Sequence, residues 1–393
     1  MSYSKVAVFG AGAMGGGIAH VLAAASIDVI LIDVTSDLVA QGIKRIEATC
    51  ASAVKKGKLT PEARDGLMGR IKGSTSQGEA ASADLVIEAI VEDRKIKATL
   101  FQGLNRLCGR ESVFATNTST LSVTDLASLS GRPDRFLGLH FFNPVHAMKL
   151  VEVIPGLDTA HSVVSRSKEA MAAIGKVPVV AQDCPGFLVN RILLQYITEA
   201  LLCVEDGVNP EEIDAQAKGA GFPMGPLALV DMVGIDVSCH TQPILHEAYG
   251  VRFPFPQIVR KLFDAGRLGA KSGKGIYAEG KIDDEFRRIV GKVSTDPFTI
   301  DRCIARAVNE AVYCLQEGVA SAEEIDRAMV LGTGFPDGPL HWADARGLDE
   351  VLATLEGLAG AKGPRFWPHH LLKTHVAGGR LGKKTKKGFF EYP

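Results

Sequence analysis

The chain has 393 residues, which is too long for one compact core and predicts two or three domains. Hydrophobic residues make up 46% and charged residues 23%, and the formal net charge is −1, as in ordinary soluble globular proteins. This balance argues against a nucleic-acid partner, since binding a polyanion needs a concentrated positive surface. The short basic run at 383–387 is interpreted as solvated surface.

Neither a membrane span nor a targeting leader is evident in the sequence. No stretch is long and apolar enough to cross a bilayer. The first residues, MSYSKVAVFG, lead into a predicted strand without a basic and apolar leader. We therefore expect a soluble, cytoplasmic protein without a membrane partner.

The cysteines form no recognisable framework. Their count is odd and no Cys-x-x-Cys pair occurs, which predicts buried free thiols rather than disulfides or a zinc site. We expect no bound metal. The seven positions are Cys50, Cys108, Cys184, Cys203, Cys239, Cys303 and Cys314.

Short apolar runs alternate with helical patterns through the first half of the chain. Strands are expected at 5–9, 28–32, 83–90, 112–117 and 135–142, and helices at 14–25, 37–56 and 94–107. A further strand-like stretch, MKLVEVI, covers 148–154. Such alternation predicts βαβ units and a mostly parallel sheet, which is an α/β fold.

The second half is dominated by helical periodicity and contains an internal repeat. The stretch 207–236, with a Gly-Phe-Pro turn, returns at 318–349, and GRLGAKSGKGIY at 266–277 returns as GRLGKKTKKGFF at 379–390. This pattern indicates duplication of a whole all-α domain. We expect three domains, at 1–182, 183–292 and 293–393, with a boundary near the Asp-Cys-Pro-Gly stretch.

A glycine-rich stretch follows the first predicted strand. Residues 10–15, GAGAMG, fit G-x-G-x-x-G, open a predicted helix, and precede Asp33 at the end of the next strand. Together these contexts are typical of a Rossmann-type dinucleotide site. Gly10 is expected to allow the turn, Gly12 the approach of a pyrophosphate, and Gly15 close packing of helix and strand. Asp33 is expected to bind the adenosine ribose, which favours NAD over NADP.

Polar residues beside later apolar runs indicate a second site. His140 follows the strand-like RFLGL, and Glu152 lies on the next strand-like stretch. A histidine whose ring is oriented by a carboxylate is a usable general base, as oxidation of an alcohol by a nicotinamide cofactor requires.

Each candidate also has an ordinary structural explanation. His140 fits a core histidine and Glu152 a surface carboxylate. Ser119 fits an N-cap for a helix beginning near Ser122, and Asn190 fits a helix cap or a solvated face. The residue pattern alone leaves both interpretations open.

The motifs GAGAMGGGIA, EAIVEDRKIK, NTSTLSV, GLHFFNPV, MKLVEVI, DCPGFLVNRI and GFPMGPLALVDMVGID occur in this order. Together they resemble the L-3-hydroxyacyl-CoA dehydrogenase family, across about residues 4–277. The resemblance implies a Rossmann-type domain followed by a helical domain, with an acyl-CoA substrate lying in the cleft between them.

The resemblance also implies roles for individual residues. His140 would be the catalytic base and Glu152 its partner, while Ser119 would bind the substrate's oxygen and Asn190 would orient the substrate. Lys56 would bind coenzyme A phosphates. The residues expected to bind the cofactor are Gly10, Gly12, Met14, Gly15, Asp33, Glu92, Lys97 and Asn117.

The second repeat departs from this pattern. Its counterpart of CPGFLVNR is DPFTIDR, 296–302, so Asp301 stands where Asn190 stands in the first. We expect this copy to be non-catalytic. Short members of the family dimerise through the helical domain, so the duplication predicts a monomer with an internal pseudo-dimer, or a homodimer formed through another surface.

Three functions are compatible with these residues. The first is NAD-dependent oxidation of (S)-3-hydroxyacyl-CoA to 3-oxoacyl-CoA, with chain length and direction open. The second is a related hydroxyacid or sugar-acid dehydrogenase that takes no coenzyme A. The third is a non-catalytic dinucleotide-binding protein, against which the set Ser119, His140, Glu152 and Asn190 argues, because pure binding needs no base.

Overall fold

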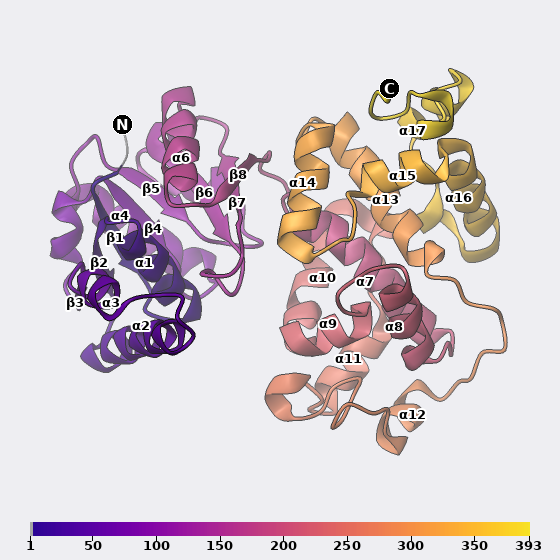
Figure 1. Ribbon diagram of the computed structural model, residues 1–393, viewed down its shortest axis with the longest axis horizontal. Helices are drawn as coiled ribbons and strands as arrows, with labels where there is room; N and C mark the ends of the chain where they lie inside the picture. The colour runs from indigo at the N-terminus through magenta and orange to yellow at the C-terminus, as the bar shows by residue number, and fades with distance from the viewer. Residues whose placement is uncertain (1–2) are drawn as a thin grey trace. The chain divides into compact units, whose positions relative to one another are not determined.

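A computed structural model describes residues 3–393. The chain forms two compact units, which divide between Phe187 and Leu188 (Figure 1).

The first unit is built on a doubly wound sheet. Within residues 3–187 the strands lie in the order β3-β2-β1-β4-β5-β6-β7-β8, and every neighbouring pair is parallel except β6 and β7. The order reverses between β1 and β4, which is where such folds bind ligands. The strands are β1 (Lys5–Phe9), β2 (Asp28–Ile32), β3 (Ile71–Ser74), β4 (Leu85–Glu88), β5 (Val113–Thr116), β6 (Phe136–Phe141), β7 (Leu150–Pro155) and β8 (Val177–Val180).

Helices cover both faces of this sheet. They are α1 (Ala13–Ala24), α2 (Ser36–Lys55), α3 (Pro61–Met68), α4 (Arg94–Leu107), α5 (Val123–Ser130) and α6 (His161–Ala173), with short 3₁₀ turns at Gln77–Ser82 and Pro133–Arg135. Alternate residues of β1 point to opposite faces, as the two-residue period of a strand requires. Val6 and Val8 pack beneath α1, α2 and α6, whereas Ala7 and Phe9 pack beneath α4 and α5.

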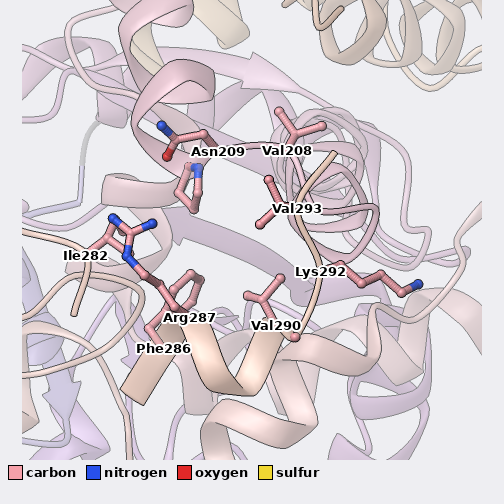
Figure 2. Close-up of a pocket in the computed structure, with 11 residues that line it drawn as sticks. Val208, Asn209, Ile282, Phe286, Arg287, Val290, Lys292 and Val293 are labelled. Atoms are coloured by element: carbon pink, nitrogen blue, oxygen red, sulfur yellow. The ribbon is translucent and has the colours of Figure 1, made fainter. Parts of the chain in front are cut away.

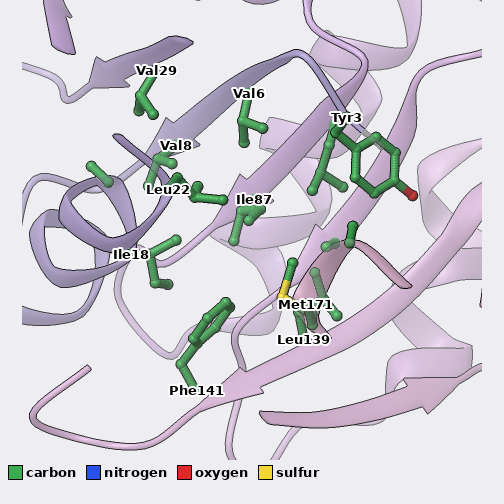
Figure 3. Close-up of a cluster of buried hydrophobic side chains, with 14 of the residues drawn as sticks. Tyr3, Val6, Val8, Ile18, Leu22, Val29, Ile87, Leu139, Phe141 and Met171 are labelled. Atoms are coloured by element: carbon green, nitrogen blue, oxygen red, sulfur yellow. The ribbon is translucent and has the colours of Figure 1, made fainter. Parts of the chain in front are cut away.

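The larger of the two cores lies beneath α1. Figure 3 shows Ile18 and Leu22 of this helix against Val8 of β1, with Phe141 of β6 in the same cluster. All four side chains are at most 2% exposed. Because these residues sit at the end of β6 and along α1, this core holds the glycine-rich helix rigidly against the strands that carry the site.

The predicted elements agree with the structure where the hydrophobic pattern is long or clean. The strands at 5–9 and 28–32 and the helix at 94–107 have the predicted bounds. Four elements, α3, α6, β3 and β8, were not predicted from the residue pattern. Strand β3 is short and contains glycine, and β8 contains Pro178, which is tolerated because β8 is the sheet's edge strand.

The second unit is helical. Its helices are α7 (Val189–Glu205), α8 (Pro210–Gly219), α9 (Pro226–Val233), α10 (Ile235–Tyr249), α11 (Gln257–Asp264), α12 (Asp284–Val290), α13 (Asp301–Gln316), α14 (Ala322–Thr333), α15 (Pro339–Arg346), α16 (Leu348–Lys362) and α17 (His370–Ala377). Short 3₁₀ turns lie at Gly250–Arg252, Ala270–Ser272, Pro364–Phe366 and Lys383–Thr385. None of the helices between residues 3 and 393 is long and apolar enough to cross a membrane.

The centre of this unit is the packing of α7 against α13 (Figure 1). Most residues of both helices are buried, including several arginines and glutamates. The segment that joins α12 to α13 docks beside α7, where the Ser294 amide donates to the Gly207 carbonyl oxygen over 2.8 Å. Beneath this segment lies an apolar cavity of about 230 Å³, lined by Val208, Phe286, Val290 and Val293 (Figure 2).

Candidate functional site

The candidate site lies along one edge of the sheet. Strands β1, β4, β5 and β6 are parallel, so their carboxyl ends meet at the same edge. The glycine-rich turn follows β1, Glu88 ends β4, Asn117 follows β5, and His140 lies near the end of β6. The topology therefore brings together residues that are up to about 130 positions apart in the sequence.

Two glycines are required by the packing of this turn. Gly10 has φ of +96°, and a Cβ there would lie 2.4 Å from the carbonyl oxygen of Ala89. A Cβ at Gly15 would lie 1.8 Å from the carbonyl oxygen of Gly10. Both positions are therefore restricted to glycine by the fold itself.

Gly12 is different, because nothing lies within 4 Å of a Cβ built there and its φ is −68°. Neither sterics nor backbone strain requires glycine at this position. A bare backbone at the start of α1 instead leaves room for a ligand to approach. No side chain caps α1, so the N–H groups of its first turn face outward with the positive end of the helix dipole.

Asp33 lies at the carboxyl end of β2, next to the glycine-rich turn. Its Oδ2 accepts a hydrogen bond from the Ala11 amide over 2.7 Å, and its Oδ1 accepts one from the Val34 amide over 2.7 Å. A cavity of about 590 Å³ begins at this carboxylate, between Val34 and Ile96, whose side chains are exposed. A polar carboxylate beside an apolar slot suits a ribose attached to a planar base.

His140 and Glu152 form a buried pair on neighbouring strands. They are register partners in the antiparallel pairing of β6 with β7. Nδ1 of His140 lies 2.6 Å from Oε2 of Glu152, and both side chains are at most 8% exposed. Phe142 and Phe187 pack around the imidazole, with ring centroids 4.6 and 5.9 Å from it.

This geometry fixes the imidazole tautomer. An ionised carboxylate only accepts hydrogen bonds, so Nδ1 carries the proton and donates it to Glu152. The other ring nitrogen, Nε2, then has a free lone pair in the neutral form and is a proton acceptor. The arrangement is that of a general base with an orienting acid.

Ser119 lies in the loop between β5 and α5, and one oxygen of Glu92 organises that loop. Oε1 of Glu92 accepts from the Thr118 hydroxyl over 2.5 Å, the Ser119 amide over 2.9 Å and the Thr120 amide over 3.2 Å. The Ser119 hydroxyl is 3.5 Å from the same oxygen, which is too far for a strong bond and leaves it able to bind a substrate. Ser122, and not Ser119, caps α5.

Glu92 is held in its charged form. Burial raises the pKa of this carboxyl group, but the Lys97 ammonium and the hydrogen bonds from Thr118 and Ser119 outweigh burial, so the pKa lies below its usual range. Lys97 is 1% exposed, and its ammonium contacts Glu92 at 3.1 Å and the fully buried Glu88 at 2.6 Å.

The remaining predicted residues have varied positions. Asn117 joins β5 to β6, since its Oδ1 accepts from the amide of Phe141 over 2.8 Å. Met14 is half-buried in the first turn of α1, and Lys56 is exposed at the C-terminal end of α2. Asn190 is the second residue of α7, in the helical unit.

Sequence reasoning missed several residues that build this edge. Asp183 accepts hydrogen bonds from the Ser122 hydroxyl and the Thr124 amide, and so fixes the start of α5. The Lys176 ammonium donates to the carbonyl oxygens of Val145 and Met148, in the loop between the strands of His140 and Glu152. Only the apolar run before Glu88 hinted at a buried carboxylate.

The described residues, 3–393, contain no group of three or more His, Cys, Asp or Glu side chains placed to hold a metal ion. The sheet edge itself carries a histidine with a carboxylate partner, a serine hydroxyl and a glycine-rich turn.

Two known domain families match the chain, and the boundary between them lies close to the boundary between the two units. Residues 5–184 match the 3-hydroxyacyl-CoA dehydrogenase NAD binding domain, and residues 186–279 and 298–392 match the 3-hydroxyacyl-CoA dehydrogenase C-terminal domain. Fatty acid oxidation complex subunit alpha from Shewanella amazonensis is 36% identical over 393 residues, which cover 96% of this chain. The alignment spans 56% of that relative's length.

Solved structures include similar proteins. 3-Hydroxybutyryl-CoA dehydrogenase from Escherichia coli K12 is 33% identical, with a TM-score of 0.89 over 96% of this chain and 99% of that chain. (S)-3-Hydroxybutyryl-CoA dehydrogenase from Ralstonia eutropha is 37% identical, with a TM-score of 0.69 over 71% of this chain and 100% of that chain. The chain therefore belongs to the 3-hydroxyacyl-CoA dehydrogenase family, whose NAD-binding domain forms its first unit and whose C-terminal domain forms its helical unit.

Proposed function

We propose that this protein oxidises (S)-3-hydroxyacyl-CoA to 3-oxoacyl-CoA with NAD, reversibly, and that His140 is the general base. The observation that carries the proposal is the buried contact of 2.6 Å between Nδ1 of His140 and Oε2 of Glu152. It lies on the same sheet edge as the glycine-rich turn of an NAD-binding domain. Two solved relatives that span most of this chain are described as 3-hydroxybutyryl-CoA dehydrogenases.

In this proposal each site residue has one role. Nε2 of His140 takes the proton of the substrate hydroxyl, while a hydride leaves the carbon that carries this hydroxyl. Glu152 keeps Nδ1 protonated and stabilises the imidazolium that forms. The Ser119 hydroxyl donates a hydrogen bond to the substrate oxygen, and Asn190 orients the substrate. Lys56 binds the phosphates of coenzyme A as an exposed cation.

The cofactor is NAD, which accepts the hydride when bound. The free amides at the start of α1 would bind its pyrophosphate where Gly12 leaves the backbone bare, with Met14 in the same turn. Asp33 would accept hydrogen bonds from the adenosine ribose and would repel the extra phosphate of NADP. Glu92, Lys97 and Asn117 lie at the carboxyl ends of the central strands, where the nicotinamide end would reach.

The direct test is loss of nicotinamide absorbance when the protein is mixed with NADH and acetoacetyl-CoA. We expect turnover with NADH, little with NADPH, and at least a hundredfold loss in His140→Gln, about what a general base contributes. NADH binding without turnover would reject the acyl-CoA assignment and favour an acid that lacks coenzyme A. Retention on immobilised coenzyme A separates these two substrate classes.

We also propose that 183–292 and 293–393 are two copies of one helical domain related by a pseudo-two-fold axis. The C-terminal domain family matches 186–279 and 298–392. Supporting contacts are reciprocal: Nε of Arg191 in α7 donates to Glu310 in α13 over 2.6 Å, and Nε of Arg302 in α13 donates to Glu199 in α7 over 2.7 Å. These arginines and glutamates occupy equivalent positions in the repeat, as an isologous interface requires.

The two Gly-Phe-Pro turns meet in the same reciprocal way. A Cβ at Gly221 would lie 3.2 Å from Pro336, and a Cβ at Gly334 would lie 3.0 Å from Pro223. Each glycine thus lies close to the other copy's proline, and both have a positive φ, +94° and +73°, which favours glycine. The counterpart of Asn190 is Asp301, whose carboxylate is 2.9 Å from the Arg346 guanidinium, so the second copy offers no equivalent amide.

This arrangement predicts a monomer, because α13 already covers the face of α7 that a second chain would need. Sedimentation velocity should give one chain per particle. A dimer whose cross-links join α7 of one chain to α7 of another would contradict the proposal.

A further inference from the structure

We propose that Glu88 is a positioning residue, which acts through Lys97 and Glu92 to hold the loop that carries Ser119. The proposal rests on the proposed role of Ser119 in substrate binding. Glu88 reaches this loop through the two other charged groups. Glu88 ends β4, Glu92 lies in the loop that follows, and Lys97 lies in the first turn of α4.

Glu88 is a fully buried carboxylate with partners on three elements. Its Oε1 accepts from the Ile90 amide over 2.8 Å and from the Lys97 ammonium over 2.6 Å, and its Oε2 accepts from the Thr116 hydroxyl over 2.6 Å. The side chain is 0% exposed. A charge so buried persists only when it is paired and hydrogen-bonded, and removing one partner leaves the other uncompensated.

Lys97 links this buried group to the loop region. It lies in the first turn of α4, which begins at Arg94, and its ammonium reaches both Glu88 and Glu92. An ammonium has three hydrogens, so two are engaged here and one remains. Two carboxylates thus share one cation, and Glu88 takes the shorter contact, 2.6 Å against 3.1 Å for Glu92.

The Lys97 ammonium contacts only one oxygen of Glu92, so the other oxygen is available to the loop. Lys97 contacts Oε2 of Glu92, while Oε1 accepts from Thr118, Ser119 and Thr120. The Thr118 hydroxyl in turn accepts from the amide of Leu121 over 2.9 Å, which closes the turn. The orientation of the Ser119 hydroxyl therefore depends on a carboxylate that is itself held by Lys97.

Removing the charge of Glu88 would change this balance. Lys97 would be left buried with Glu92 as its remaining carboxylate, and the strongest available contact would draw the ammonium toward that group. The Lys97 ammonium would then compete with the amides of Ser119 and Thr120 for Oε1 of Glu92. A glutamine at position 88 has one acceptor oxygen in place of two, so it could not accept both from the Lys97 ammonium on one side and from the Thr116 hydroxyl on the other.

The experiment compares Glu88→Gln with Glu79→Gln, which removes an exposed carboxylate paired to Lys72 on the surface. In Glu88→Gln we expect kcat with acetoacetyl-CoA to fall about 10- to 100-fold, as for a misplaced binding group. The control should stay at the parent rate, since Glu79 lies at the surface and makes no contact with Glu88, Lys97 or Glu92. A parent-level kcat in Glu88→Gln would overturn the proposal.

A double variant tests whether Glu88 acts through Ser119. If it does, Ser119→Ala combined with Glu88→Gln should be no slower than the slower single variant, because the two changes remove one function. Independent effects, whose fold-losses multiply, would overturn the proposal. Thr116→Val, which removes one contact to Glu88 and no charge, serves if Glu88→Gln fails to fold, and the same coupling is expected.

A third readout does not depend on the proposed reaction. Amide hydrogen exchange of a peptide covering 117–122 should be faster in Glu88→Gln than in the parent protein, and unchanged in Glu79→Gln. Parent-level exchange in Glu88→Gln would reject the positioning role even if the protein turned over another substrate. Conversely, an inactive parent protein with faster exchange in the variant would reject the proposed reaction alone.

Discussion

His140 and Glu152 face each other across the antiparallel pair β6 and β7, with Nδ1 and Oε2 2.6 Å apart. The rest of the sheet is parallel, so the turn back at β7 is what brings a carboxylate opposite the histidine. The two residues are twelve positions apart in the chain, and the Lys176 ammonium holds the loop between them by donating to two of the loop's carbonyl oxygens.

Glu152→Gln should lower kcat about 10²- to 10⁴-fold, the range in which an oriented general base contributes. The amide keeps the shape but cannot stabilise an imidazolium, and its NH₂ group can impose the wrong tautomer. NADH affinity, measured by fluorescence titration, should be unchanged. Activity within threefold of the parent would mean that the carboxylate is not needed, and the base would have to be sought elsewhere.

Gly12→Ala and Gly15→Ala form a matched pair that separates ligand binding from folding. Alanine in place of Gly12 meets open space and an ordinary φ, so the melting temperature should hold while NADH affinity falls by at least tenfold. Alanine in place of Gly15 would press on the Gly10 carbonyl oxygen, and we expect a loss of about 3 kcal/mol of stability, at the upper end for overpacking. Thermal melts and NADH titrations of both variants measure this. Full NADH affinity in Gly12→Ala would contradict the assigned role.

The buried carboxylate of Glu199 should be essential to the stability of the helical unit. It is 0% exposed and contacts the guanidinium groups of Arg302, Arg306 and Arg365 at 2.7 to 2.9 Å. Burial raises the pKa of this carboxyl group, but the three arginines outweigh it and hold the pKa low. Glu199→Gln leaves those cations uncompensated and should lower the free energy of unfolding by about 3–5 kcal/mol.

Urea unfolding monitored by helical circular dichroism checks this value. Glu79→Gln is the control, since a solvent-exposed ion pair adds little to stability. A change in Glu199→Gln no larger than the control's would show that the arginines find other partners.

The order of the Ser119 loop should depend on pH in the acid range. The folded-state pKa of Glu92 lies below its unfolded value of about 4.3, so its stabilising contribution is complete above that pH and is lost as pH falls through the folded value. Hydrogen exchange of the 117–122 peptide, corrected for intrinsic rate, should therefore rise only in this acid window. Glu92→Gln should exchange fast throughout, without the pH step; a step that persists in this variant would assign the effect to another group.

Local pattern was sufficient for much of the fold. The spacing of apolar residues predicted the strands 5–9 and 28–32 and the helix 94–107, because one face or one short run of each must be buried. The need for glycine at positions 10 and 15 could also be predicted from the sequence, since backbone crowding in a strand–turn–helix unit is a local property. The repeat in the second half was visible as sequence identity alone.

Other features were decided only by the tertiary structure, because they depend on groups brought together from distant parts of the chain. Strand β8, which contains a proline, forms because it can pair with β7 at the edge of the sheet. In the sequence Glu88 is only the last residue of an apolar run. Its contacts with Lys97 and Thr116 form only in the folded chain. Sequence determined which residues were candidates for chemistry, through motif and periodicity. Strand register determined that His140 meets Glu152, because only pairing across the sheet can turn separated side chains into one hydrogen-bonded base.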